Sequence, residues 1–171
     1  VEATVAAAHG RGLVVACHCL DDATARAAAD AGVDVLAHTP VRALSADTVA
    51  AWRGRAVVTS LVAFGAADDT LANLTALRDG GVTVLYGTDF GNTRDAGIDP
   101  VELELMAAAG LSPQEILASG TTRPATFWGF DDLGAIEAGK DASLLVLPAD
   151  PLVTPSTLAA PEMVLIRGRR R

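Results

Sequence analysis

Four short apolar runs, each followed by a segment with helix signals, constrain the fold of this chain more than any other feature. Their β-branched character predicts buried strands over residues 13–18, 33–37, 56–62 and 82–86. Helices are expected at 1–9, 23–31, 45–52 and 68–79, most of them beginning at an Asp or Ser cap and all ending at or before a glycine. Alternation at roughly 20–27 residues is typical of βαβ units around a parallel sheet. No glycine-rich phosphate loop follows any of these strands.

The pattern changes after the fourth strand. Asp99-Pro100 predicts a helix start, Ser112 to Glu115 forms a capping-box motif, and a third helix is expected over 124–128. Two late strands are expected at 142–147 and 163–166, with loop between them and a solvated arginine tail at 169–171. We therefore predict an α/β unit over 1–130 and a small separate β segment over 131–171.

Titratable side chains stand at the ends of three of the predicted strands. His18 ends the first strand, His38 follows the second, and Asp89 follows the fourth. The carboxyl ends of parallel strands meet at one edge of a sheet, which is where (β/α) barrels keep their chemistry. Imidazole and carboxylate suit a divalent metal, most readily zinc. Asp89 could also accept a proton from a metal-bound water, which makes it the candidate catalytic residue.

The structural alternatives differ for each residue. A single histidine at a strand end is more often structural than functional, and only the shared placement of the three ligands favours a site. Cys17 and Cys19 flank His18, so in a strand both thiols point away from it, which argues against a Cys-His-Cys zinc cluster. His9 is interpreted as the C-terminal residue of a helix, favoured there by the helix dipole.

Bulk properties exclude several classes of function. The formal net charge of −8 argues against a nucleic-acid partner. No apolar run approaches the ~20 residues of a membrane span, and no signal peptide is visible, so neither a membrane partner nor secretion is expected. Two cysteines are too few for a disulfide framework, and the cytoplasm is the expected compartment.

The sequence resembles the metal-dependent amidohydrolase superfamily, in particular its imidazolonepropionase-like and prolidase-like members. The matching segments are LVVACHCLDDATARAAADAGVDVLAHTP, VTVLYGTDFG, VELELMAAAGLSPQEILASGTTRPATFWGF and LGAIEAGKDASLLVLPADPL. The resemblance implies that His18, His38 and Asp89 are the metal ligands of the fifth, sixth and eighth strands of a barrel. It also implies that the two late strands belong to an accessory β-sandwich, although Ser143 stands where the family usually has Asp.

Two of the family's features have no counterpart in this chain: the His-x-His of the first barrel strand and the carboxylated Lys of the fourth. The chain also begins at Val1 rather than at Met. We therefore expect the carboxyl-terminal half of a (β/α)8 TIM barrel, strands 5–8, with part of the β-sandwich. The missing amino-terminal half of the same barrel is the expected partner. Without it, residues such as Val14, Val35, Val58 and Val84 would lose packing partners, and open sheet edges would favour homo-oligomers.

Two classes of function remain open at this point. The first is a metal-dependent hydrolase that acts on carbon–nitrogen bonds of a small-molecule amide, cyclic amide or dipeptide substrate. The second is a non-catalytic amidohydrolase-like assembly module, in which the metal site has decayed. The retained His18, His38 and Asp89 favour the first class.

Overall fold

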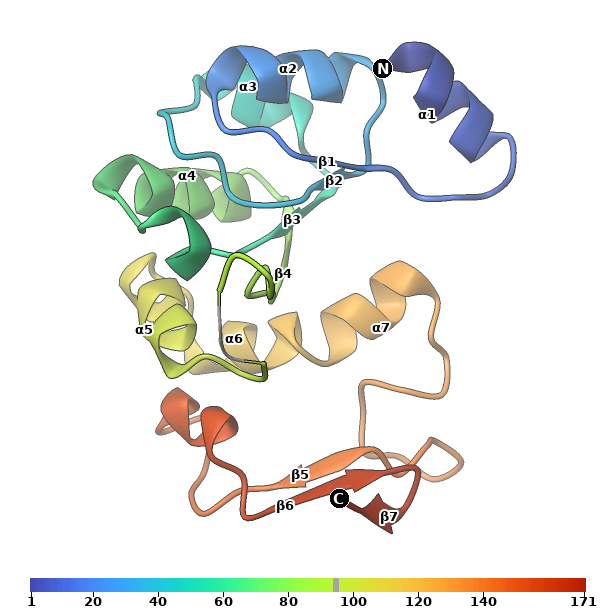
Figure 1. The fold of residues 1–171 in the computed structure, drawn as a ribbon, viewed down its shortest axis with the longest axis vertical. Coiled ribbons are helices and arrows are strands. Elements are labelled where there is room, and N and C mark those ends of the chain that lie inside the picture. Colours follow the sequence, from blue (N-terminus) through green and yellow to red (C-terminus); the bar gives the residue numbers. More distant parts are fainter. Residues whose placement is uncertain (94–95) are drawn as a thin grey trace.

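A four-stranded parallel sheet organises the structure, a computed structural model that describes residues 1–93 and 96–171. The strands lie side by side in chain order and run down the middle of Figure 1. Val35 pairs with Ala56, and Val57 with Val84. The predicted parallel sheet is therefore confirmed, and its strands are β1 Ala16–Cys17, β2 Val35–Leu36, β3 Ala56–Val58 and β4 Thr83–Leu85.

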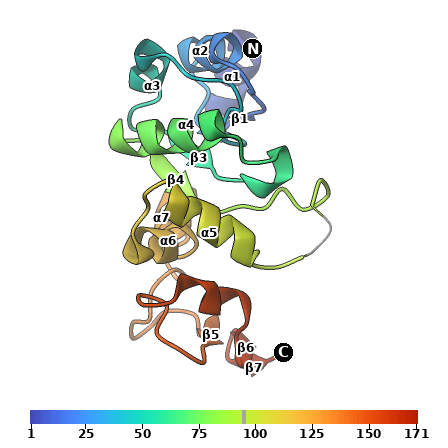
Figure 2. The ribbon, with the colours of Figure 1, turned by 90° about the vertical axis from the view of Figure 1, so that its left-hand side faces the viewer.

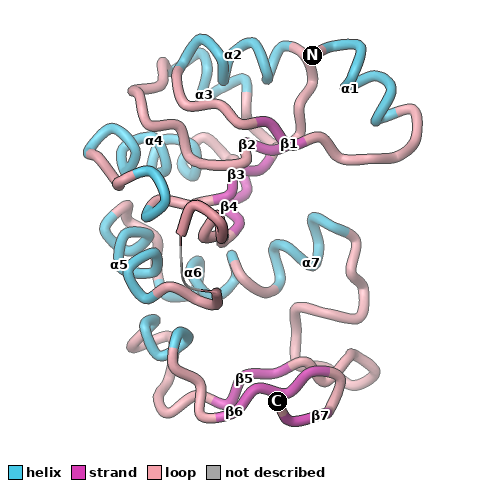
Figure 3. Tube along the Cα trace, in the orientation of Figure 1, coloured by secondary structure: helices cyan, strands magenta, loops and turns pink. Residues whose placement is uncertain are grey.

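Helices follow the strands as the sequence pattern predicts, and Figure 3 shows the alternation along the chain. All four strands are shorter than predicted. β3 ends early because Ser60 adopts a left-handed φ of 47° and the chain then turns into a short 3₁₀ helix, η1 Val62–Phe64. The helices are α1 Glu2–His9, α2 Asp22–Asp30, α3 Ala46–Ala51, α4 Asp68–Asp79, α5 Pro100–Ala108, α6 Pro113–Ser119 and α7 Thr122–Trp128.

The two faces of the sheet are packed differently. Alternate strand residues point to opposite sides, so Leu36, Val57 and Val84 join the main core beneath α4 and α5. Figure 2 looks onto this helical side, with α4 and α5 in front of the strands. The opposite face carries a smaller cluster of Val35, Ala56 and Leu85, against which a single aromatic residue of α7, Phe127, packs.

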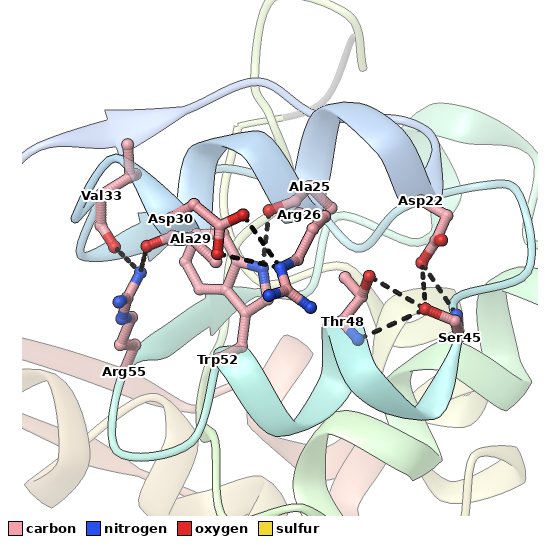
Figure 4. A network of polar contacts seen from close by, with 10 residues as sticks. All are labelled: Asp22, Ala25, Arg26, Ala29, Asp30, Val33, Ser45, Thr48, Trp52 and Arg55. Atoms are coloured by element: carbon pink, nitrogen blue, oxygen red, sulfur yellow. Dashed lines mark hydrogen bonds and ion pairs between the residues drawn. The ribbon is translucent and has the colours of Figure 1, made fainter. Parts of the chain in front are cut away.

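Buried polar contacts tie α3 to α2. The indole of Trp52, which is fully buried, donates from Nε1 to the Ala25 carbonyl at 3.0 Å. Arg55 donates from Nη1 to the carbonyls of Ala29 and Val33 at 2.8 Å (Figure 4). These contacts join the segment around Trp52 and Arg55 to carbonyls of α2 and of Val33 just beyond it, and they hold the first two strand–helix units together.

A second sheet follows the helices. The two predicted late strands are present as β5 Leu144–Val146 and β6 Met163–Ile166, which pair antiparallel, and β6 pairs with a third strand, β7 Arg169–Arg170. The predicted solvated arginine run at 169–171 is exposed, but Arg169 and Arg170 also form a strand that was not predicted, because the turn at Arg167-Gly168 returns the backbone to β6. The predicted loop contains a 3₁₀ helix, η2 Pro155–Ala159, whose Leu158 joins the main core. None of the described helices is long and apolar enough to cross a membrane.

Candidate metal centre

The two predicted histidine ligands lie in contact at the carboxyl edge of the sheet. His18 directly follows β1, and His38 stands two residues after β2. Nδ1 of His18 and Nε2 of His38 face each other within hydrogen-bond reach, and the rings meet edge to face with centroids 4.6 Å apart. Parallel pairing of β1 with β2 produces this meeting, because it brings two residues 20 positions apart to the same edge.

The environment of His38 favours its neutral form. Its side chain is buried, and that burial, together with the neighbouring His18, lowers the pKa of His38, while the charge of Asp89 acts in the opposite direction. A neutral imidazole carries a lone pair, which is the form that binds metals. The facing pair of imidazole nitrogens therefore supplies two donors of the kind that bind a divalent metal such as zinc.

Asp89 lies beyond the end of β4 in a tight turn. Its backbone has a left-handed φ of 54°, and its carbonyl accepts the N–H groups of Asn92 and Thr93. One carboxylate oxygen, Oδ2, accepts a hydrogen bond from Asn92 Nδ2 at 2.8 Å. Left-handed backbone at a non-glycine residue is costly and gathers at functional sites. Among residues 1–93 and 96–171, no three His, Cys, Asp or Glu side chains are grouped closely enough to hold a metal ion. The roles of His18, His38 and Asp89 as ligands stay predictions.

The two cysteines lie on the core side of the strand end. Cys17 and Cys19 have sulfur atoms 3.5 Å apart, and Cys19 donates to the Thr24 carbonyl of α2. Burial, with the nearby Cys17, raises the pKa of the Cys19 thiol to about 12. A protonated thiol is a poor metal ligand, so this sulfur contributes no donor at neutral pH.

Two residues that bear on the histidine pair were missed in the sequence. Phe64 packs against His38, and the fully buried Glu102 of α5 binds the backbone of Leu61 and Val62, in the segment that leads to Phe64. Phe64 carried no signal, because it lies in an apolar run. Glu102 could have been found, since it stands one position before Leu103 and four before Met106, both of which are core residues of α5.

Comparison with known proteins decides the family. The model of the Amidohydrolase family matches residues 1–171, the whole chain. This chain belongs to the amidohydrolase family. Curated relatives of this amidohydrolase include uncharacterized proteins of Mycobacterium tuberculosis and Mycobacterium bovis, 28% identical over 99% of this chain and 50% of theirs. The chain thus spans half the length of those curated relatives.

Solved structures resemble this amidohydrolase over 99% of its residues. A crystal structure of an amidohydrolase has 27% identity and a TM-score of 0.81, and a candidate prolidase from Bifidobacterium longum has 26% and 0.82. A Xaa-Pro dipeptidase with methionine bound in its active site has 23% identity and a TM-score of 0.87, and this likeness shows the shared fold. The chain covers 47%, 49% and 47% of these structures, respectively. The α/β fold and the prolidase-like resemblance are therefore confirmed.

Proposed function

We propose that this chain is the carboxyl-terminal half of a (β/α)8-barrel amidohydrolase that hydrolyses carbon–nitrogen bonds of small amides or dipeptides with a bound divalent metal, most readily zinc. The observation that carries the proposal is the facing pair of His18 Nδ1 and His38 Nε2 at the carboxyl edge of neighbouring parallel strands. Family membership and the likeness to a candidate prolidase support it.

Each residue has a distinct task in this proposal. His18 and His38 would hold the metal through the two nitrogens that face each other. When bound, a divalent metal makes water nucleophilic at neutral pH by lowering its pKa to about 7. The Asp89 carboxylate would bind the same metal and accept the proton of that water. Asn92, bonded to Asp89 Oδ2, would orient the carboxylate.

The test uses the full-length protein that contains this chain. Metal analysis and a screen of dipeptides and N-acyl amino acids should show bound zinc and zinc-dependent hydrolysis. His18→Ala and His38→Ala should each lose metal and turnover. His9→Ala is the matched control, because the third histidine of the chain is paired with Asp34 at 2.9 Å on the surface. A full-length protein with neither metal nor turnover would favour the assembly-module alternative.

A further inference from the structure

An aromatic side chain from the segment after the third strand lies against both histidines of the candidate centre. The short helix η1, which follows β3, ends at Phe64. The centroid of the Phe64 ring is 4.5 Å from that of His38 and 6.1 Å from that of His18. The segment that follows β3, the one strand of this sheet without a predicted ligand, therefore contributes an apolar side wall to the candidate centre.

A buried carboxylate holds the segment that carries Phe64. Glu102 of α5 is 0% exposed, and its two oxygens accept the backbone N–H groups of Leu61 and Val62, each at 2.9 Å. Burying a carboxylate is costly unless it is fully hydrogen-bonded, and here one carboxylate takes two consecutive N–H groups directly after the left-handed Ser60. This bidentate contact determines the direction in which the chain leaves β3, and hence where Phe64 lies.

The segment that carries Phe64 has no charged side chain of its own. Residues 59–67, between β3 and α4, contain no Asp, Glu, Lys, Arg or His. A second aromatic residue, Phe90, directly follows Asp89 on the neighbouring β4 loop and is 65% exposed. A charged substrate group placed against this wall would lose hydration without meeting a counter-charge on the segment, whereas an apolar group would be stabilised by burial.

We propose, building on the hydrolase function above, that Phe64 contacts an uncharged, apolar side chain of the substrate next to the scissile bond, and that Glu102 is a positioning residue that holds Phe64 there. The substrate class is then a dipeptide or N-acyl amino acid with an aliphatic or aromatic side chain at this position.

The first test compares Phe64→Ala with wild type in the full-length protein. Four dipeptides that share one leaving amino acid and carry Phe, Leu, Gly or Lys at the other position form the panel. Wild type should prefer Phe and Leu. Phe64→Ala should lower kcat/KM for these two by about tenfold or more and for the Gly substrate by less than about threefold, because a lost apolar contact is worth about 10–200-fold. Phe130→Ala, at a 51% exposed position beyond α7, is the matched control.

The second test addresses the positioning role of Glu102. Glu102→Gln keeps the side-chain volume, but its amide nitrogen cannot accept an N–H group, so one of the two contacts is lost. We expect the same loss of preference for Phe and Leu as in Phe64→Ala, together with faster hydrogen exchange at Leu61 and Val62. Glu104→Gln, on the exposed face of the same helix, should change neither. If Glu102 has a structural role alone, Glu102→Gln would lower the melting temperature and leave the substrate preference unchanged.

A binding measurement separates this inference from the proposed function. Calorimetry with L-phenylalanine and L-lysine reports on the apolar wall without turnover. If hydrolysis is absent but Phe64→Ala weakens the binding of L-phenylalanine by about tenfold, the hydrolase proposal is overturned, and Phe64 keeps its role as a binding contact for an apolar side chain. Zinc-dependent hydrolysis with preference for Lys, or a preference unchanged by Phe64→Ala, would overturn this inference alone. A protein with neither turnover nor Phe binding would overturn both.

Discussion

At the scale of single residues, the carboxyl edge of the sheet depends on one glycine. Gly87 follows β4 and lies so close to Val58 that a Cβ there would overlap the Cγ1 of that side chain. The Gly87 carbonyl accepts the N–H of Ser60 at 2.9 Å and the hydroxyl of Thr59 at 3.2 Å. The close approach of the β3 and β4 ends therefore explains why a glycine stands two positions before Asp89.

Gly87→Ala should destabilise the full-length protein by about 1–3 kcal/mol, the usual cost of overpacking a core. Chemical denaturation measures the change. Gly120→Ala is the control, because a Cβ there would meet only Tyr86, at an ordinary 3.9 Å. Equal stability of the two variants would show that the β3 and β4 ends move apart without cost.

Asp89→Asn tests the proposed proton acceptor. An amide oxygen can still contact a metal but cannot take a proton from water, so turnover should fall much more than substrate binding weakens. General-base catalysis contributes about 10²–10⁴-fold, and kcat should fall within that range. Steady-state kinetics on metal-loaded full-length protein measure it, with the exposed Asp131→Asn as control. Unchanged kcat in the loaded variant would exclude the role.

At the scale of elements, capping side chains stand at the start of four of the described helices. Asp21, Ser45, Asp99 and Ser112 each accept a backbone N–H from the first turn of the helix that follows, as the sequence predicts. In α6 the cap is reciprocal, because Glu115 Oε2 also accepts the Ser112 N–H at 2.9 Å. Such a box satisfies two donors that the helix itself leaves without partners.

Removal of this box should have a pH-dependent cost. Ser112→Ala should lower the free energy of unfolding by about 0.5–2 kcal/mol at neutral pH. The Ser112 N–H lowers the pKa of the Glu115 carboxyl below its usual 4.5. Because the folded pKa lies below the unfolded one, the Glu115 contribution is present above about pH 4.5 and is lost as the pH falls through the folded value.

Unfolding of wild type and Glu115→Gln at pH 7 and pH 3 tests this sign. The difference in stability between the two proteins should shrink at pH 3. Glu104→Gln on α5 should behave like wild type at both pH values, since Glu104 lies on the exposed face of its helix. If the stability difference between wild type and Glu115→Gln grows as the pH falls, the lowered pKa of Glu115 would be contradicted.

At the scale of the whole molecule, the proposed amino-terminal half would meet this chain at the two edges of the sheet, next to β1 and next to β4. Leu13 and Val14, directly before β1, are 57% and 45% exposed. Arg123 of α7 has a buried Nη1 without a hydrogen-bond partner among the described residues. The expectation that Val35 and Val84 would lose their packing was wrong, because they are 1% and 0% exposed in this chain.

Residues 1–171 expressed alone should therefore be inactive and should associate. Burial of one large apolar side chain is worth about 1.5–3 kcal/mol, a large share of a domain's net ~5–15 kcal/mol, and exposed sheet edges recruit other chains. Light scattering, thermal melting and zinc-dependent hydrolysis measure the outcome. Co-expression with the proposed amino-terminal half should yield a defined, active complex. A monomeric, cooperatively folded and active 1–171 would refute the half-barrel proposal.

Local signals in the sequence were sufficient to predict the order of the four parallel strands and their helices, four of the side-chain caps, and the placement of His18, His38 and Asp89 at strand ends. The helix α4 begins at Asp68 as expected, but without a side-chain cap, because Ala67 stands at the cap position. These features depend on residues within a few positions of one another, so periodicity and capping chemistry reveal them.

Only the tertiary structure placed Phe64 against the histidines and Glu102 under Leu61 and Val62. The Glu102 contact joins residues 40 and 41 positions apart, and it takes the N–H groups of Leu61 and Val62, which the predicted strand over 56–62 would have used in a ladder. Side chains that meet through the packing of α5 on the sheet leave no periodic trace in the sequence, because their partners are determined by the topology.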